Sequence, residues 1–370
     1  MSDNRRVRGL IRKEFLQILR DPSSIAIAFL MPVFLLLLFG YGLSLDAEHV
    51  PLAVVVEKPS AETARFTGML QQSRYFSPQH FASMRDAELA LRMHEVNGIV
   101  HLRASFAADL KAERESGIQV IVNGVDANTA RMVQGYLGSV WALWLEQRLR
   151  AAGQAPVVNI DQRIWYNTAV SSRNYLVPGL IAVIMTLIGA LLTALVMARE
   201  WERGTMEALM VTPVSMYEVL LGKLIPYFIL GMGGMTLSVA MALWLFDVPL
   251  RGSAVVLFAS AAIFLLAALG MGLAISITAR NQFVAGLAAI ITTFLPAFML
   301  SGFIFDIASA PLAVQAVTYL VAARYFIAII QTIFLAGNIW PVILPNAAAL
   351  LAMAGLFLGI VVARSRKRLD

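Results

Sequence analysis

The sequence predicts a polytopic α-helical membrane protein with six transmembrane helices and an α/β extracytoplasmic domain inserted between spans one and two. Apolar runs of about 20 residues recur along the chain, and each is long enough to cross a bilayer as a helix. Of the 370 residues, 59% are hydrophobic and only 14% are charged, whereas soluble domains carry about 25% charged residues. The apolar runs lack the period-2 alternation of barrel strands, so the spans are expected to be helices.

The distribution of charge argues against a nucleic-acid partner. The formal net charge is +6, but acidic and basic residues balance within residues 46–173, so the excess belongs to the membrane part. There it gathers before the first apolar run and after the last one, which predicts that both termini are cytoplasmic. The basic residues concerned are Arg5, Arg6, Arg8, Arg12, Lys13 and Arg20 before the first run, and Arg364, Arg366, Lys367 and Arg368 after the last.

Residues 1–22 predict an amphipathic helix lying on the cytoplasmic face of the bilayer. Apolar side chains recur at three- to four-residue spacing from Val7 to Leu19, with basic residues between them. A solvated basic tail is the alternative. Asp21-Pro22 predicts an N-cap followed by proline at the first helical position. The first transmembrane helix is expected at 23–45, as a retained anchor, because no small-x-small cleavage site follows it cleanly.

Residues 46–173 predict a separate, periplasmic α/β domain. β-rich runs alternate with helical patterns, an order typical of α/β folds. Trp141, Trp144 and Leu145 form an apolar stripe on the last helix, which is expected to be core. The expected strands are 52–56, 97–102 and 118–122, and the expected helices are 61–72, 86–95, 105–115 and 128–152.

Residues 174–370 predict a five-helix transmembrane domain. The stretch at 312–335 is apolar enough for a further span, but Arg324 stands in its middle, where a charge costs about 2.5–3.5 kcal/mol on insertion scales. A further span would also move the basic C-terminus to the outside. We therefore expect an outer re-entrant or interfacial helix at 312–335. The five spans are expected near 175–198, 217–246, 254–279, 283–305 and 340–363.

Motifs for catalysis or cofactor binding are missing from the sequence. Gly222-Lys223 is no phosphate loop, because Tyr217 stands where the first glycine should be. The chain has no cysteine and four histidines without ligand spacing, so neither thiolate chemistry nor a metal site is expected. The chain is therefore expected not to be an enzyme. Gly270-x-Gly272 and Gly355-x-x-x-Gly359 predict close helix packing instead.

The most informative segment is the loop at 199–213, between the second and third spans. It reads R-E-W-E-R-G-T-M-E-A-L-M-V-T-P from Arg199 to Pro213. Charged residues open it, Gly204 allows a tight approach, and Met206, Leu209 and Met210 supply an apolar edge. A short amphipathic helix of this kind suits docking into a groove of a partner protein. An ordinary interfacial loop helix is the alternative.

This loop, with its pattern R-E-x-E-x-G-T-x-E-x-L-x-x-T-P, resembles the coupling-helix signature of ABC-2 type permeases, the membrane subunits of ATP-binding-cassette exporters. Residues 11–22, 164–167 and 300–302 resemble further parts of the same family, in the subgroup with a large periplasmic domain. The resemblance covers essentially the whole chain. The resemblance fails at Val321–Phe326. Relatives often have an Asn-Pro-x-x-His/Tyr-Phe run there, whereas this segment has no proline, so the resemblance does not predict its local turn.

The resemblance implies a permease subunit in the bacterial inner membrane. Such a subunit forms the transmembrane path and couples ATP hydrolysis by a separate ATPase to efflux of a drug-like, cationic or other small molecule. The ATPase would bind ATP and Mg²⁺, so no cofactor is expected in this chain. The other partners implied are a second permease, identical or paralogous, and in some relatives a periplasmic adaptor.

The resemblance also implies the residues that couple this chain to the ATPase. The three glutamates among them would pair with basic groups of the ATPase, the glycine would permit close approach, and the first threonine would cap the helix. These residues are Glu200, Glu202, Gly204, Thr205, Glu207, Leu209, Thr212 and Pro213.

Two other classes of function stay open on the residues alone. A membrane sensor or scaffold would use residues 46–173 as an external ligand-binding domain, but such proteins usually carry a cytoplasmic output domain, and the cytoplasmic segments here are short. A secondary transporter would need ionisable residues at the midplane or repeated broken helices. The sequence shows no inverted repeat and predicts almost no buried charge. It does not identify the substrate.

Overall fold

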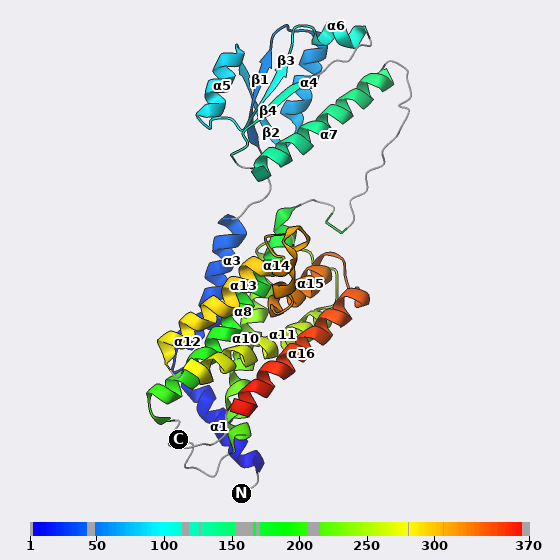
Figure 1. Cartoon of the computed structure of the whole chain (residues 1–370). Coiled ribbons are helices and arrows are strands. Elements are labelled where there is room, and N and C mark those ends of the chain that lie inside the picture. The colour runs from blue at the N-terminus through cyan, green and yellow to red at the C-terminus, as the bar shows by residue number, and fades with distance from the viewer. Residues whose placement is uncertain are drawn as a thin grey trace. The chain divides into compact units, whose positions relative to one another are not determined.

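The computed structural model describes the chain as two compact units (Figure 1). One is a helical unit formed by residues 1–44 and 164–370, and the other is an α/β unit formed by residues 45–163. The second boundary lies earlier in the chain than the expected position at residue 173. The described residues are 3–42, 49–112, 118–125, 127–151, 166–167, 171–205, 215–279, 281–305 and 307–364.

Six helices of the described chain are long and apolar enough to cross a membrane. They begin and end within a few residues of the predicted spans, which confirms a polytopic helical architecture. Four are α8 (Ser172–Glu202), α10 (Met216–Trp244), α11 (Ala254–Ala279) and α16 (Trp340–Arg364). The first span joins α2 (Pro22–Ile25), a π-helical turn (Ala26–Leu30) and α3 (Met31–Gly42), and the fifth joins α12 (Gln282–Ala289), a π-helical turn (Ile290–Phe294) and α13 (Leu295–Leu300).

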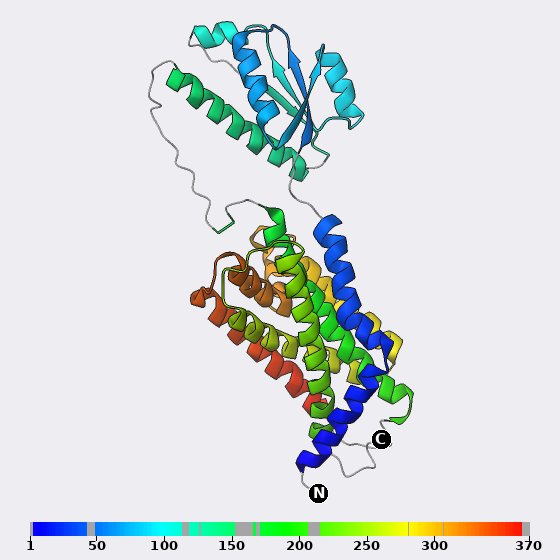
Figure 2. The same ribbon diagram turned by 180° about the vertical axis from the view of Figure 1, so that it is seen from behind.

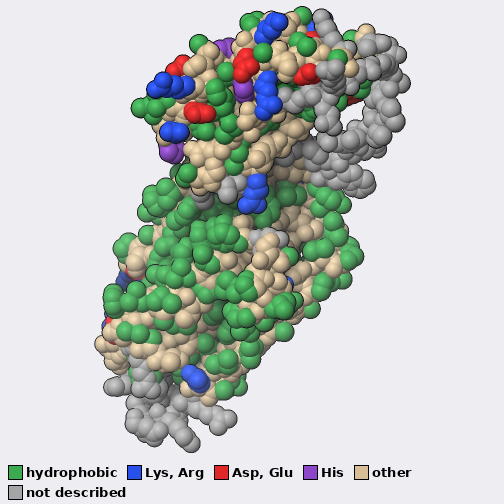
Figure 3. Space-filling view, turned by 45° about the horizontal axis from the view of Figure 1, so that its top comes forward, with side chains coloured by type: hydrophobic (Ala, Val, Ile, Leu, Met, Phe, Trp, Pro, Cys, Tyr) green, Lys and Arg blue, Asp and Glu red, His purple; other side chains and the backbone are tan. Residues whose placement is uncertain are grey.

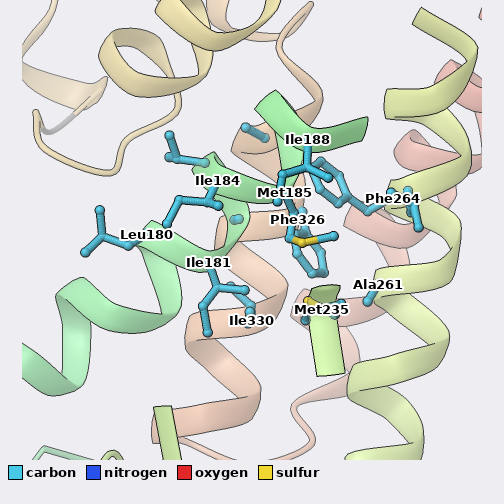
Figure 4. Close-up of a cluster of buried hydrophobic side chains, with 14 of the residues drawn as sticks. Leu180, Ile181, Ile184, Met185, Ile188, Met235, Ala261, Phe264, Phe326 and Ile330 are labelled. Carbon is cyan, nitrogen blue, oxygen red and sulfur yellow. The ribbon is translucent and has the colours of Figure 1, made fainter. Parts of the chain in front are cut away.

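Helix α8 is the centre of the helical unit. In its most apolar stretch 94% of the residues are buried, against 22% in the first span and 17% in α16. Its aliphatic side chains meet residues of α10, α11 and α15 (Ala322–Leu335) in the cluster shown in Figure 4. Within that cluster Phe264 and Phe326 stack with ring centroids 4.3 Å apart. The outer spans therefore leave much apolar surface uncovered, and Figure 3 shows hydrophobic side chains over most of the visible helical unit.

Helices α8 and α11 pack closely at a glycine of α11. A Cβ atom at Gly272 would lie 2.2 Å from the Thr193 hydroxyl oxygen and 2.3 Å from the Ala190 carbonyl oxygen. The Thr193 hydroxyl in turn donates to the Leu269 carbonyl at 2.9 Å. The absence of a side chain thus lets a hydroxyl bridge two helices inside an apolar environment, where such a bond has no competition from water.

The two predicted glycine packing motifs have different outcomes. The prediction is confirmed for Gly270-x-Gly272, since a Cβ atom at Gly270 would also lie 3.2 Å from the Phe357 side chain. It is wrong within this chain for Gly355 and Gly359, where an added Cβ would meet no atom within 4 Å. These two glycines lie on the exposed side of α16, and spacing alone does not reveal which side of a helix is covered.

Residues 312–335 form a bent helix pair. Helices α14 (Leu312–Thr318) and α15 meet at an angle of 79°. Arg324, in the first turn of α15, lies with its guanidinium 3.9 Å from the Tyr319 ring centroid and donates to the Thr318 hydroxyl. The chain therefore turns at 319–321 without the proline that the family pattern has there. Because of the bend, the Arg324 charge interacts with the Tyr319 ring and the Thr318 hydroxyl, and such partners stabilise a charge near the membrane.

The bent pair begins and ends at the same end of the helical unit. Just before it, the Gly302 carbonyl accepts a hydrogen bond of 3.1 Å from the Tyr175 hydroxyl, in the first turn of α8. At its end, the Gly252 amide, between α10 and α11, donates to the Ile333 carbonyl at 2.8 Å. The start of α8 and the end of α10 lie at one end, so the geometry favours six crossings.

The first and fifth spans share a backbone irregularity. Each contains a π-helical turn followed, two positions later, by a proline: Pro32 in one case and Pro296 in the other. Proline has no N–H to donate to the carbonyl four residues earlier, so the α-helical bond pattern is interrupted at both places. Helix α10 closely approaches the π-helical turn of the first span, since a Cβ atom at Gly234 would lie 2.4 Å from the Ala28 carbonyl oxygen.

The α/β unit contains a four-stranded sheet with the strand order β2-β1-β3-β4. Strand β1 runs parallel to β2 and β3, and β4 runs antiparallel to β3. Strand β2 was not predicted, because it is an edge strand with a single buried residue, Phe76, and with Pro78 in its middle. The elements are β1 (Val50–Val56), α4 (Ala61–Gln72), β2 (Phe76–Phe81), α5 (Met84–Arg92), β3 (Gly98–Leu102), α6 (Phe106–Lys111), β4 (Gln119–Val122) and α7 (Ala127–Ala151).

Alternate residues of β1 supply two hydrophobic cores, one on each face of the sheet. Leu52 and Val54 pack in the core that contains residues of α4 and α7, whereas Ala53 and Val55 pack in the core that contains residues of α5. In the first core, Trp141 and Trp144 stack with ring centroids 4.9 Å apart. The apolar stripe on the long helix is therefore core, as predicted.

A larger side chain at Gly272 is expected to destabilise the helical unit. Gly272→Val would force α11 away from α8 and break the Thr193 bridge, at a cost of about 1–3 kcal/mol typical of overpacking. The melting temperature of the purified chain in detergent should fall. Gly355→Val is the matched control, because that position is open, and equal melting temperatures for the two variants would contradict the packing described here.

Candidate functional site

The end of α8, where the 199–213 segment begins, is joined by ion pairs of Glu200 to the N-terminal helix α1 (Asp3–Leu19) and to the start of α10. Figure 2 shows α1, in dark blue, beside the first turns of α10. Gly222 permits this contact, since a Cβ atom there would lie 2.8 Å from the Leu10 Cβ. The amphipathic helix predicted at the N-terminus is thus present, and part of its surface packs on the transmembrane helices.

Four charged side chains meet where these three helices join, and we call them the ionic cluster: Lys13 and Glu14 of α1, Glu200 of α8 and Lys223 of α10. The Lys223 Nζ lies 3.0 Å from the Glu14 Oε1 and 3.0 Å from the Glu200 Oε1. The Lys13 Nζ lies 3.3 Å and 3.2 Å from the same two atoms. Two ammonium groups therefore share two carboxylates, and the cluster is electrically neutral.

The ionic cluster is largely shielded from solvent. The exposed fractions of the Lys223, Glu14 and Glu200 side chains are 3%, 3% and 5%, and only Lys13 reaches solvent, at 47%. Burial lowers the pKa of Lys13, but the adjacent carboxylates outweigh it and hold that pKa above its usual value. Removing one partner of a buried pair is costly because the other charge is left uncompensated.

A second ion pair fastens the start of the first span to α8. The Arg199 guanidinium donates to the Asp21 carboxylate at 2.6 Å. Asp21 also accepts hydrogen bonds from the Ser23 amide at 3.2 Å and from the Ser24 hydroxyl at 2.7 Å, so it caps α2 as predicted. Burial of Asp21 raises its pKa, but these hydrogen bonds and the Arg199 charge outweigh burial and bring the pKa below its usual value.

A third contact joins the end of α8 to α12. The backbone amide of Gln282, the first residue of α12, donates to the Glu202 carboxylate at 2.9 Å, and the Gln282 side chain donates to the same group. The Arg199 Nε donates to the Gln282 side-chain oxygen at 3.3 Å. The last turn of α8 is therefore fixed to α1, to α10 and to the start of the fifth span.

The structure places Glu200 at the end of α8, within the ionic cluster. Helix α8 continues to Glu202, so Glu200 and Glu202 belong to its last turn and to no separate loop helix. Glu200 is only 4% exposed and lies 3.0 Å from Lys223 of its own chain, and its expected pairing with basic groups of an ATPase stays a prediction. Glu202 is exposed but already bonded to Gln282.

Gly204 and Thr205 complete the end of α8. Gly204 has φ +67°, a left-handed conformation in which a side chain is strained, although no neighbour within 4 Å would meet a Cβ there. The Thr205 hydroxyl donates to the Glu200 carboxylate and to the Glu200 carbonyl, the latter at 3.2 Å. It is thus bonded to the last turn of α8, and its expected capping of a helix in the 199–213 segment stays a prediction. The remaining predicted coupling residues, Glu207, Leu209, Thr212 and Pro213, lie outside the described residues.

Sequence reasoning missed three members of the ionic cluster. Lys13 and Glu14 were part of the N-terminal helix expected on the membrane surface, and Lys223 was considered in the rejected phosphate loop Gly222-Lys223. The expectation of almost no buried charge is also wrong, since Glu14, Glu200 and Lys223 are all buried. The available signal was a lysine within the apolar stretch of α10, because such a residue is expected to have a partner.

Lys223→Met is expected to destabilise the helical unit strongly. It leaves Glu14 and Glu200 buried with Lys13 as their only cation, and breaking a buried pair in this way costs about 3–5 kcal/mol. The melting temperature in detergent should fall clearly. The exchange Glu14→Lys with Lys223→Glu keeps two positive and two negative charges, and it should recover part of the loss. A double variant no more stable than Lys223→Met would refute an electrostatic role.

Comparison with known proteins agrees with this architecture. A family model described as ABC-2 family transporter protein matches residues 22–363. The probable multidrug ABC transporter permease YbhS of Escherichia coli strain K12 is 43% identical, over 99% of this chain and 98% of that protein. The probable multidrug ABC transporter permease YbhR of the same strain is 26% identical, over 94% of this chain and 97% of that protein.

A third relative, the inner membrane transport permease YhhJ of Escherichia coli strain K12, is 26% identical over 79% of each chain. The family match includes all six candidate spans almost completely, together with the α/β unit between the first two. With this match, the chain belongs to the ABC-2 family of transporter permeases.

Proposed function

We propose that this chain is the permease subunit of a multidrug exporter in a bacterial inner membrane, coupled to ATP hydrolysis by a separate ABC ATPase. Members of the ABC-2 family are transport components that work with an ABC ATPase subunit. The observation that carries the proposal is the anchoring of the last turn of α8 to α1, α10 and α12, at the point where the 199–213 segment begins. The family assignment does not favour the sensor alternative.

The 199–213 segment acts as the coupling element in this proposal. Thr205 is hydrogen-bonded to Glu200, and Glu200 is held by Lys223, so a displacement of the segment is transmitted to α8 and α10 together. Helix α8 forms the centre of the unit, and its movement must repack the surrounding spans. ATP binding drives transport only if the ATPase contacts the segment differently in its two states.

The remaining partners follow from the same proposal. ATP and Mg²⁺ are bound by the ATPase, and a second permease, identical or paralogous, completes the path through its own spans. The cargo is a drug-like, cationic or other small molecule, in line with the multidrug names of two relatives. The α/β unit lies on the periplasmic side, where it gates release or docks an adaptor.

Substitutions in the coupling segment should uncouple transport from ATP hydrolysis. Glu207→Lys reverses a charge proposed to face a basic cleft, which typically costs several kcal/mol in the wrong pairing. Gly204→Val strains a residue at φ +67°. For each variant, ATP hydrolysis stimulated by substrate in the reconstituted complex should fall at least about tenfold, which corresponds to 1.4 kcal/mol, while the melting temperature of the permease changes little.

The matched control for Glu207→Lys is Glu88→Lys, the same charge reversal on the exposed face of α5. This control should retain coupling and should still co-purify with the ATPase. If both coupling-segment variants bind the ATPase and drive transport like the parent chain, the segment does not couple the two subunits.

The proposed orientation is testable because the chain contains no cysteine. Cysteine introduced at the exposed position Glu88 should react with a membrane-impermeant thiol reagent added outside intact cells whose outer membrane has been permeabilised. Cysteine at the exposed position Arg8 should react only after the inner membrane is opened. External labelling at position 8, or protection at position 88, would reverse or refute this topology.

A further inference from the structure

We propose that a basic depression beside the ionic cluster binds the phosphate-bearing headgroup of an anionic phospholipid. The depression has a volume of about 540 Å³. One wall comes from α1 and the turn that follows it, with Lys13, Leu16, Arg20 and Asp21, and the other wall comes from the end of α8, with Arg199 and Arg203. It thus lies between the N-terminal helix and the central span. The proposed transport function uses the Arg199–Asp21 pair on its wall but gives the hollow itself no ligand.

The charges around the depression leave two arginines in excess. Lys13 is balanced within the neutral ionic cluster, and Arg199 is paired with Asp21. Arg20 and Arg203 are exposed, and no ion pair joins either of them to an acidic side chain within the described residues. Two guanidinium groups that face one hollow from different helices fit a phosphate group, because arginine binds phosphate oxygens in a bidentate manner.

Both arginines stand where membrane-spanning segments end. Arg20 precedes Pro22, at which the first span begins, and Arg203 directly follows Glu202, the last residue of α8. Lipid headgroups lie at that depth, and basic pockets between transmembrane helices are known to take anionic headgroups. A soluble anion would need no such position, so the location favours a lipid.

Apolar side chains beside the depression fit the rest of a lipid molecule. Leu16, on the wall of the depression, is 48% exposed, and Leu19 on the same helix is 69% exposed. A phosphate held between Arg20 and Arg203 would place the glycerol and acyl chains of its lipid near such leucines. An acidic segment of the ATPase would satisfy the arginines but would not explain the neighbouring exposed leucines.

The test is the affinity of the purified full-length chain in detergent for phosphatidylglycerol, measured by native mass spectrometry. The double variant Arg20→Gln with Arg203→Gln should bind at least about tenfold more weakly, because it removes both guanidinium groups proposed to hold the phosphate through charge-assisted hydrogen bonds. The control Arg8→Gln with Arg12→Gln removes the same charge from exposed positions of α1 and should change the affinity less than twofold. Melting temperatures of both variants should match the parent.

Further measurements distinguish a lipid headgroup from a free anion, from general surface charge and from contact with the ATPase. Inorganic phosphate at millimolar concentration should not displace phosphatidylglycerol, and displacement would identify a free-anion site and overturn the lipid assignment. If the two double variants lose affinity for phosphatidylglycerol to the same extent, binding depends only on the general surface charge, and the depression is not a specific site. If Arg20→Gln with Arg203→Gln binds phosphatidylglycerol normally but no longer retains the ATPase, the arginines face the ATPase and the proposal is wrong.

Discussion

A single ammonium group, that of Lys223, holds together three helices that are distant in the sequence. It lies 3.0 Å from a carboxylate of α1 and 3.0 Å from a carboxylate of α8, and it is shielded from water. A buried charge of this kind tolerates few arrangements, because each partner must stay in place to offset the loss of hydration. The positions of the N-terminal helix and of the end of α8 therefore depend on one another.

The anchored end of α8 is continuous with the most buried helix of the unit. From Leu176 to Ala198 nearly every residue of α8 is buried, and at Gly272 the packing against α11 leaves no room for a methyl group. Closely packed interfaces shift between discrete arrangements more readily than they deform. A displacement at the end of α8 is for this reason expected to move the helix as a rigid body.

The sequence predicted the parts of the architecture in which apolar residues form long runs or recur with a helical period. Six apolar runs and the helical pattern before Pro22 led to the spans and to α1, and the charge of Arg324 led to a re-entrant or interfacial helix at 312–335, whose bend was not predicted. Strand β2 was missed, because an exposed edge strand shows no apolar alternation. The ionic cluster was missed for another reason: Glu14 and Lys223 are 209 residues apart, and no local pattern records which distant charge a side chain will meet. The family resemblance singled out Glu200 but carried no information on its partners within the chain, Lys13 and Lys223.

The paired π-helical turns have a mechanical consequence. A regular helix resists bending because each bend stretches backbone hydrogen bonds, whereas a helix already interrupted by a π turn and a proline has fewer such bonds to stretch. The first and fifth spans, which combine a π-helical turn with a proline, are therefore more compliant at these turns than a regular helix of the same length. A force applied to the end of α8 would be accommodated by flexure at Ala26–Leu30 and Ile290–Phe294.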